Sequence, residues 1–251
     1  MEFSNRYIVF FAIALCLVAA LGVSSAAVAL RPMQASNRQL FKQQNVLLAS
    51  GVLAAGEVAS PEEVEAAFAN IKEVVIDRQT GELLNDDPTT VDPIRLAKRD
   101  ESSEETPAEH SGTQVKRLSN KLLAYEVNVP GHEGIVLPIH GDGLWSTLYG
   151  FLALTPDGKT VQGITFYEHL ETPGLGGEVD NPAWKAQWPG KVALDENGVP
   201  QVEVVKSGMA TNPDTQVDGI SGATITSRGV GNMVQLWLSD VGYGPYLATK
   251  R

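Results

Sequence analysis

The sequence begins with a long run that carries no charged side chain. Between Arg6 and Arg31, all 24 residues from Tyr7 to Leu30 are uncharged. As an α-helix this run is about 36 Å long, enough to cross a hydrocarbon core of about 30 Å. The chain must therefore place this run in a membrane or lose it by cleavage, and its folded body must come from the residues that follow.

A cleaved secretory signal is the competing interpretation, because Ala27-Val28-Ala29 matches the small-x-small pattern of a cleavage site. The run is longer than the roughly 7 to 15 residues of a signal core, and its basic flank is a single arginine. Lipidation at Cys16 is disfavoured, because large apolar residues surround it. We therefore expect a retained single-pass anchor at residues 1–32 and one domain at residues 33–251.

The charged residues lie almost entirely on the body. The chain has 30 acidic and 19 basic residues, a net charge of -11, and only Glu2 and Arg6 fall in the anchor before Arg31. This acidity argues against a nucleic-acid partner, which needs clustered Lys and Arg. Arg31, Arg38 and Lys42 after the run mildly favour a cytoplasmic body, but long domains translocate largely regardless of such charges. The residues alone leave the side open.

The number and positions of the cysteine and histidine residues exclude several kinds of metal and redox site in the body. Cys16 is the only cysteine, and it lies inside the apolar run. The body therefore has no disulfide, no thiolate-bound metal and no all-cysteine iron–sulfur centre. The four histidines, at positions 110, 132, 140 and 169, include no i, i+4 pair of the kind that builds a helical metal site. We expect no metal in the body.

The first half of the body mixes helix, strand and a polar excursion. Residues 33–49 predict a partly amphipathic helix next to the membrane. Ser60-Pro61-Glu62-Glu63 predicts a helix start with a capping box, and a strand follows at residues 74–77. Residues 85–113 are rich in acids and prolines, so we expect a solvated excursion without regular structure, with a docking surface for a basic partner as the alternative.

The second half is rich in strands and ends in a helix, so the body reads as an α+β domain. Pro156-Asp157-Gly158 and Glu196-Asn197-Gly198 predict hairpin turns. A stripe of apolar residues predicts a helix over residues 228–238. Short β-branched or aromatic runs predict strands at residues 122–129, 134–139, 149–154, 160–167, 191–194 and 201–206.

Three loops carry residues that can hold a ligand. Residues 218–227 place glycines and hydroxyls at a helix start, where free N–H groups and the helix dipole favour a phosphate. The alternative, which the residues alone favour, is an ordinary turn with Ser227 as N-cap. Residues 169–178 combine three glycines and a proline after a strand, and residues 140–146 offer the indole of Trp145. None of them looks like a nucleophile–base pair or a two-carboxylate site.

These loops resemble those of a known family. The run from Asp218 to Thr224 looks like the flavinylation motif of the FMN-binding domain family, in which FMN is joined through its phosphate to the last threonine. The run from His169 to Gly176 resembles the same family's second signature. With residues 141–151 and the anchor, essentially the whole chain is similar to the C subunits of sodium-translocating NADH:quinone reductases. The G subunit of the Rnf electron-transport complex shares both loops and is the alternative; the acidic excursion and the tryptophans look closer to the sodium pump.

This resemblance implies an electron-carrying subunit with covalent FMN that is inactive alone. Electrons would arrive from an iron–sulfur centre in a neighbouring membrane subunit and leave to a flavin in another, within a complex that reduces ubiquinone. The body would lie on the periplasmic side of a bacterial inner membrane, where a flavin transferase attaches the cofactor. The chain would not oxidise NADH itself, since it has no glycine fingerprint between a strand and a helix. A membrane-anchored scaffold without flavin is an alternative from another class.

The resemblance also implies roles for particular residues, within an FMN-binding region of about residues 120–245. Thr224 would accept the FMN phosphoryl group, and Thr226 is the rival acceptor. Asp218 would help the modifying enzyme to recognise or activate the site. The remaining residues would shape the phosphate seat or border the isoalloxazine: Ser221, Gly222 and Ala223 for the seat, and Glu171, Thr172, Gly174, Leu175 and, more weakly, Trp145 for the ring.

Overall fold

A single helix, α1 (Asn5–Ala49), carries the uncharged run. The computed structural model describes residues 4–54, 56–57 and 59–251. The chain divides into two units, Met1–Phe41 and Lys42–Arg251, so that α1 begins in the first and ends in the second. An 18-residue window of α1 has a mean hydropathy of 2.6 and none of it is buried. By length and composition, α1 can cross a membrane.

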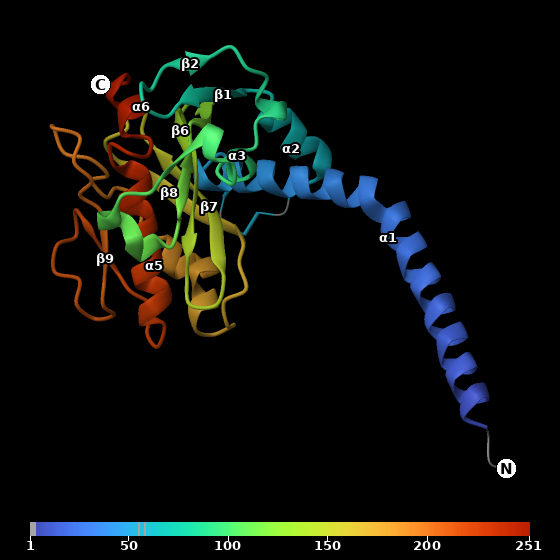
Figure 1. Cartoon of the computed structure of the whole chain (residues 1–251). Coiled ribbons are helices and arrows are strands. Elements are labelled where there is room, and N and C mark those ends of the chain that lie inside the picture. The colour runs from blue at the N-terminus through green and yellow to red at the C-terminus, as the bar shows by residue number, and fades with distance from the viewer. Residues whose placement is uncertain (1–3, 55, 58) are drawn as a thin grey trace. The chain divides into compact units, whose positions relative to one another are not determined.

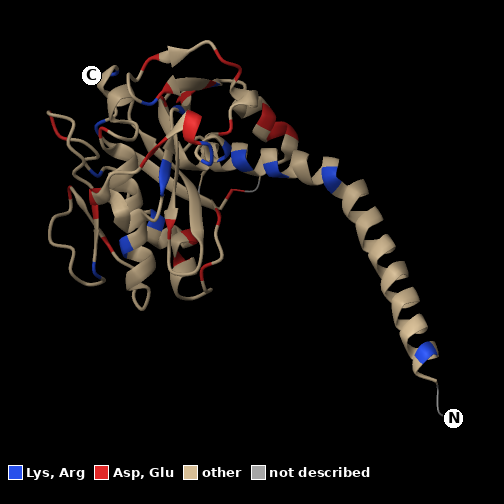
Figure 2. Cartoon of the chain, viewed as in Figure 1, with Lys and Arg blue, Asp and Glu red and all other residues tan. Residues whose placement is uncertain are grey.

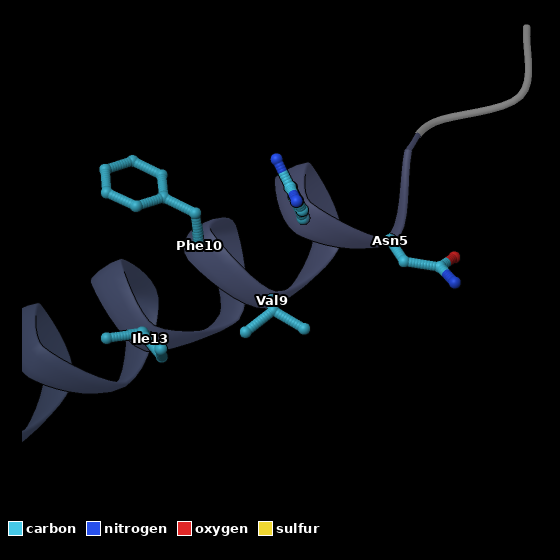
Figure 3. A pocket seen from close by; sticks show the side chains of 5 residues that line it. Asn5, Val9, Phe10 and Ile13 are labelled. Atoms are coloured by element: carbon cyan, nitrogen blue, oxygen red, sulfur yellow. The ribbon is translucent and has the colours of Figure 1, made fainter.

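The apolar side chains near the start of α1 stand in open space. No charged residue interrupts the helix between Arg6 and Arg31 (Figure 2). Val9 and Phe10 are 57% and 73% exposed, and with Asn5, Arg6 and Ile13 they border a shallow groove on the helix surface (Figure 3). In water every one of these apolar side chains would contact the solvent, whereas in a bilayer lipid chains could cover them.

The last turns of α1 belong to the folded body. The helix predicted at residues 33–49 is confirmed as the continuation of α1, and Asn45, Val46 and Leu47 are buried. The Thr165 hydroxyl of strand β8 (Val161–Glu168) donates to the Asn45 carbonyl at 3.1 Å. A Cβ at Gly163 would lie 2.4 Å from the Ala49 carbonyl oxygen. Glycine at this position therefore allows the helix end to lie directly on β8.

The body is built on a six-stranded antiparallel sheet in the order β2-β1-β5-β6-β7-β8 (Figure 1). The central hairpin of β6 and β7 is fully paired from Ile135 opposite Leu154 to Asp142 opposite Thr147. The strand bounds are β1 (Ile71–Asp77), β2 (Leu83–Leu84), β5 (Lys121–Val127), β6 (Gly134–Asp142), β7 (Thr147–Leu154) and β8 (Val161–Glu168).

Helices cover both faces of this sheet, which confirms the predicted α+β class. The end of α1 and helix α2 (Pro61–Phe68) lie on one face, where Phe68 meets Tyr125 edge-on at 6.0 Å between ring centroids. Helix α5 (Thr224–Leu238) packs against β6 on the other face (Figure 1). The main apolar core lies between α5 and the sheet, where alternate strand residues such as Leu137 and Ile139 are buried.

Two buried aromatic residues bridge a gap in the sheet. Strand β5 pairs with β6 only from Tyr125 to Val127. Beyond that point the Tyr243 hydroxyl shares its one proton between the carbonyls of Leu123 at 2.9 Å and Pro138 at 3.0 Å. The Trp237 indole N–H donates to the His140 carbonyl at 2.7 Å. Side chains from the C-terminal region thus replace ladder bonds that the two strands do not make to each other.

The predicted capping box is present, whereas the polar excursion is more regular than expected. The Ser60 hydroxyl accepts from the Glu63 N–H at 3.3 Å, and the Glu63 carboxylate accepts from the Ser60 N–H at 2.8 Å. Residues 85–113, expected to lack regular structure, form short elements because aspartates such as Asp87 and Asp92 cap them. These and the adjoining elements are η1 (Pro88–Thr90), α3 (Pro93–Leu96), η2 (Asp100–Ser102), β3 (Ser103–Glu105), η3 (Ala108–Thr113) and β4 (Arg117–Ser119).

Most predicted strands are confirmed, but two are corrected. Residues 191–194 form only isolated bridges, Thr160 with Val192 and Leu194 with Pro200, because prolines and a turn flank so short a run. Residues 201–206 shorten to β9 (Glu203–Val205), which pairs in parallel with β10 (Gln216–Asp218) outside the main sheet. The remaining short helices are η4 (Gly176–Asp180), α4 (Pro182–Lys185) and α6 (Gly244–Ala248).

The helix predicted at residues 228–238 begins four residues earlier, at Thr224. Its N-cap is Ala223, so the predicted N-cap role of Ser227 is wrong. Ser227 lies within the first turn, and its hydroxyl accepts a 2.9 Å hydrogen bond from the Ile220 N–H. The apolar stripe begins only at Val230, and the polar first turn therefore gave no periodic signal.

The Tyr243 bridge predicts a cost for losing one hydroxyl. Tyr243→Phe removes the one proton that the Leu123 and Pro138 carbonyls share, and we expect the free energy of unfolding to fall by about 1–3 kcal/mol. Tyr246→Phe is the matched control, because its partner Glu126 keeps the 2.7 Å bond to Lys250. Denaturant titration of the full chain in detergent measures both. Equal losses for the two variants would contradict the bridging role.

Candidate functional site

The three ligand-like loops meet at the start of α5. The β6–β7 turn, residues 143–146, is closed by the Gly143 N–H donating to the Ser146 carbonyl at 2.8 Å. The loop after β8 reaches this turn where the Leu170 N–H donates to the Ser146 hydroxyl at 2.7 Å. The segment before α5 lies against the same loop, because a Cβ at Gly222 would be 3.1 Å from the Leu175 side chain. Loops predicted separately thus form one site.

A buried carboxylate joins these loops. The side chain of Glu171 is 5% exposed, and its oxygens accept from the backbone N–H groups of the β6–β7 turn. Trp145 donates at 2.9 Å, Leu144 at 3.1 Å and Ser146 at 3.3 Å. The Thr226 hydroxyl of α5 donates to the other carboxylate oxygen at 2.6 Å. One side chain thus links the loop that carries it to the turn and to the helix.

These contacts decide the charge of Glu171. Burial raises the pKa of this carboxyl, but the hydrogen bonds from Thr226 and from the turn N–H groups outweigh burial and hold its pKa below the usual value. The side chain is therefore a carboxylate at neutral pH. Because the folded-state pKa is the lower one, the stability that Glu171 supplies is present above the pKa of an unfolded glutamate. It is lost as the pH falls through the lowered value.

The first turn of α5 presents one threonine outward and one inward. Thr224 is exposed, and its hydroxyl has no hydrogen bond to any residue that the structure describes. Thr226 is 1% exposed and bound to Glu171. The first backbone bond of the helix runs from the Ser227 N–H to the Ala223 carbonyl at 2.9 Å, so the N–H groups before Ser227 have no partner within the helix. An anion beside Thr224 would meet those groups and the positive end of the helix dipole.

The turn before Thr224 contains a glycine in the left-handed conformation. Gly222 has a φ of 77°, in the left-handed region where glycine is favoured. Ser221 and Gly222 are exposed, and Ala223 is buried. The Ala223 N–H donates to the Ile220 carbonyl at 3.1 Å, which closes the turn that leads into α5.

Large apolar side chains of the three loops and of the first turn of α5 face solvent. They come from the turn, from the loop after β8 and from α5 itself. Clusters of exposed apolar residues of this kind mark binding surfaces on soluble proteins. Their exposed fractions are 70% for Trp145, 48% for Leu144, 80% for Leu170, 46% for Leu175 and 54% for Ile225.

The residues expected at the ring edge separate into two groups. Thr172, Gly174, Leu175 and Trp145 are exposed, and Gly174 has a φ of 75°. We call these exposed residues, together with Leu144, the rim of the site. Glu171 instead points into the protein, beneath the turn. A carboxylate with this many internal partners positions the loops around it, and its side chain is not part of the rim.

Asp218 holds a neighbouring loop. Its carboxylate accepts from the N–H groups of Gly208 at 2.9 Å and Met209 at 3.1 Å. Its backbone carbonyl accepts from the Trp184 indole at 2.9 Å. The Gly208 bond, against only slight burial, lowers the pKa of Asp218. Asp218 therefore fixes residues 208–210 next to the segment that leads to Thr224.

Sequence reasoning placed three other residues that build the site within the candidate loops but predicted none of their contacts there. Ser146 accepts the Leu170 N–H, and Ser227 accepts the Ile220 N–H. Both are serines in short polar segments, where an ordinary turn role is equally compatible with the pattern. Gly143 gave no signal either, although a Cβ there would lie 2.7 Å from a Glu171 oxygen.

Known proteins are similar to this chain in sequence and in fold. The model of the family described as FMN-binding domain matches residues 143–239, which begin at the β6–β7 turn and end after α5. The crystal structure of Shewanella oneidensis NqrC superposes with a TM-score of 0.73 at 31% identity, over 82% of this chain and 94% of that one.

Curated relatives match almost the whole chain. The C subunit of the Na(+)-translocating NADH-quinone reductase of Pseudomonas aeruginosa is 44% identical over 96% of this chain and 94% of its own length. The protein of the same name from Yersinia pestis is 42% identical over 94% of this chain and 90% of its own length. The resemblance first read from two loops and an anchor thus extends through the body, and the chain belongs to the NqrC family, the C subunits of Na(+)-translocating NADH-quinone reductases.

Proposed function

We propose that the chain is the electron-carrying subunit of a sodium-translocating NADH:quinone reductase, and that its FMN is attached by a phosphoester bond to Thr224. One observation carries the attachment site: Thr224 is exposed at the first turn of α5, whereas Thr226 is buried and bonded to Glu171. A modifying enzyme reaches an exposed hydroxyl without unfolding its substrate. Reaction at Thr226 would break a 2.6 Å hydrogen bond inside the protein.

The helix start supports a phosphate at this position. The unpaired N–H groups of the first turn and the helix dipole favour an anion, and the glycine turn at Gly222 leaves room for close approach. In the bonded form, the Thr224 oxygen has lost its proton and stands in place of one hydroxyl of the FMN phosphate, so the chain gains the mass of FMN less water. An ester at the phosphate holds the cofactor in place and leaves the redox-active ring unmodified.

The apolar rim supports a flat ring above the helix start. Trp145, Leu144 and Leu175 come from two different loops and are exposed, and Leu175 lies next to Gly222 in the turn before Thr224. The FMN supplies the redox chemistry, while the chain's own residues bind and orient it. Thr172 and Gly174 of the same loop complete the border that we assign to the isoalloxazine.

The anchor and the relatives support a place in a membrane complex. Helix α1 is apolar enough to span a bilayer, and proteins 42–44% identical to this chain are subunits of a sodium-translocating reductase. We place the body on the periplasmic side of a bacterial inner membrane. There it would receive electrons from an iron–sulfur subunit, pass them to another flavin subunit, and meet the flavin transferase.

The attachment site predicts a clear difference between threonines. In cells that supply the flavin transferase, Thr224→Val should abolish covalent flavin because no nucleophilic oxygen remains. Thr249→Val, which changes an exposed threonine at the end of α6, should keep it. Flavin fluorescence on a denaturing gel and intact mass measure both. A fluorescent band that survives in Thr224→Val would rule out this site, and an unmodified wild-type chain would favour a scaffold without flavin.

The proposed orientation has its own test. A phosphatase that is active only outside the cytoplasm, fused after Arg251, should be active in cells. A fluorescent protein that matures only in the cytoplasm, fused at the same place, should stay dark. The reverse pattern would place the body in the cytoplasm and would agree with the charges of Arg31, Arg38 and Lys42.

A further inference from the structure

Glu171 is an unusual residue to find inside this site. Its side chain is 5% exposed, yet none of the ion pairs among the described residues includes it. A buried carboxylate without a cation is costly unless hydrogen bonds replace its hydration. Here three consecutive N–H groups and one hydroxyl do so. Among the described residues, the donors to this charge come from the 143–146 turn and from the first turn of α5.

The surrounding backbone leaves space only for this side chain. A Cβ at Gly143 would lie 2.7 Å from one Glu171 oxygen, and a Cβ at Gly176 would lie 2.5 Å from the other. The second position would also be 2.7 Å from the Thr226 hydroxyl. Two glycines from different loops therefore form the cavity that the carboxylate fills, which separates this arrangement from a chance contact at the surface.

The donors show what the carboxylate holds in place. Leu144 and Trp145 give their N–H groups to Glu171, and both project exposed side chains from the same turn. Thr226 lies two residues after Thr224 in the same helical turn. The Glu171 side chain thus connects the turn to the first turn of α5. It accepts from the Trp145 N–H at 2.9 Å and from the Thr226 hydroxyl at 2.6 Å.

We propose that Glu171 is a positioning residue of the flavin site: its buried carboxylate fixes the 143–146 turn to the first turn of α5, and so sets where Trp145 stands relative to a flavin on Thr224. This inference rests on the proposed function for its flavin part only. The fixing of the turn is a property of the chain itself.

The turn can be tested without flavin. In the full chain in detergent, Glu171→Ala should raise hydrogen exchange of the residue 144–146 amides about tenfold or more, because it removes the oxygen to which all three amides donate. Glu168→Ala makes the same truncation on an exposed residue three positions earlier and should leave exchange unchanged. Equal exchange in Glu171→Ala and Glu168→Ala would overturn the proposal.

The flavin part is tested on chains whose mass shows one attached FMN. A tryptophan beside an isoalloxazine quenches its fluorescence by electron transfer, so Glu171→Ala, which releases the turn, should raise flavin emission. The same change in a Trp145→Leu background should have no further effect. A rise of equal size in both backgrounds would overturn the proposal, because the turn would then not be the means by which Glu171 acts.

The helix side of the contact keeps the test decisive if Glu171 variants fold poorly. Thr226→Val removes only the bond from α5, so flavin emission should rise while the turn amides stay protected. Thr226→Ser keeps the hydroxyl and should restore the wild-type signal. Wild-type emission in Thr226→Val would overturn the proposal. A wild-type chain without flavin would instead refute the proposed function and leave the exchange measurement valid.

Discussion

The site depends on satisfying one buried negative charge. Glu171 exchanges its hydration for N–H groups of the 143–146 turn and the Thr226 hydroxyl, and each donor brings its own segment with it. The sheet delivers these segments: the β6–β7 hairpin ends at the turn, and β8 ends just before the loop that carries Glu171. Three segments far apart in sequence therefore meet at the Glu171 carboxylate.

In this arrangement Thr224 and Thr226 have different surroundings and different roles. Thr226 is used inside the protein as a donor to Glu171, while Thr224 stays outside at the helix start. The separation follows from helical periodicity, because residues two apart on a helix point to different sides. The first turn of α5 can thus hold the loops through the buried Thr226 and offer the exposed Thr224 to a phosphate.

Sequence patterns predicted the parts of the fold that depend on local chemistry. The long apolar helix, the Ser60 capping box and the paired strands β5 to β8 all followed from periodicity or spacing. The start of α5 did not, because a polar first turn has no apolar stripe. The excursion at residues 85–113 was also missed, since its order comes from aspartate caps and from long-range bonds such as Arg117 to the Ser103 carbonyl at 2.8 Å.

The candidate site was found only in outline for a similar reason. Glycine-rich loops and the resemblance to flavoproteins identified Thr224, yet nothing in the pattern distinguished it from Thr226 or placed Glu171 inside. The most direct test of the central claim is fragmentation mass spectrometry of the flavin-bearing peptide from the unmutated full-length chain. We expect FMN less water on Thr224, whereas the same mass on Thr226 or Ser221 would contradict the proposed attachment.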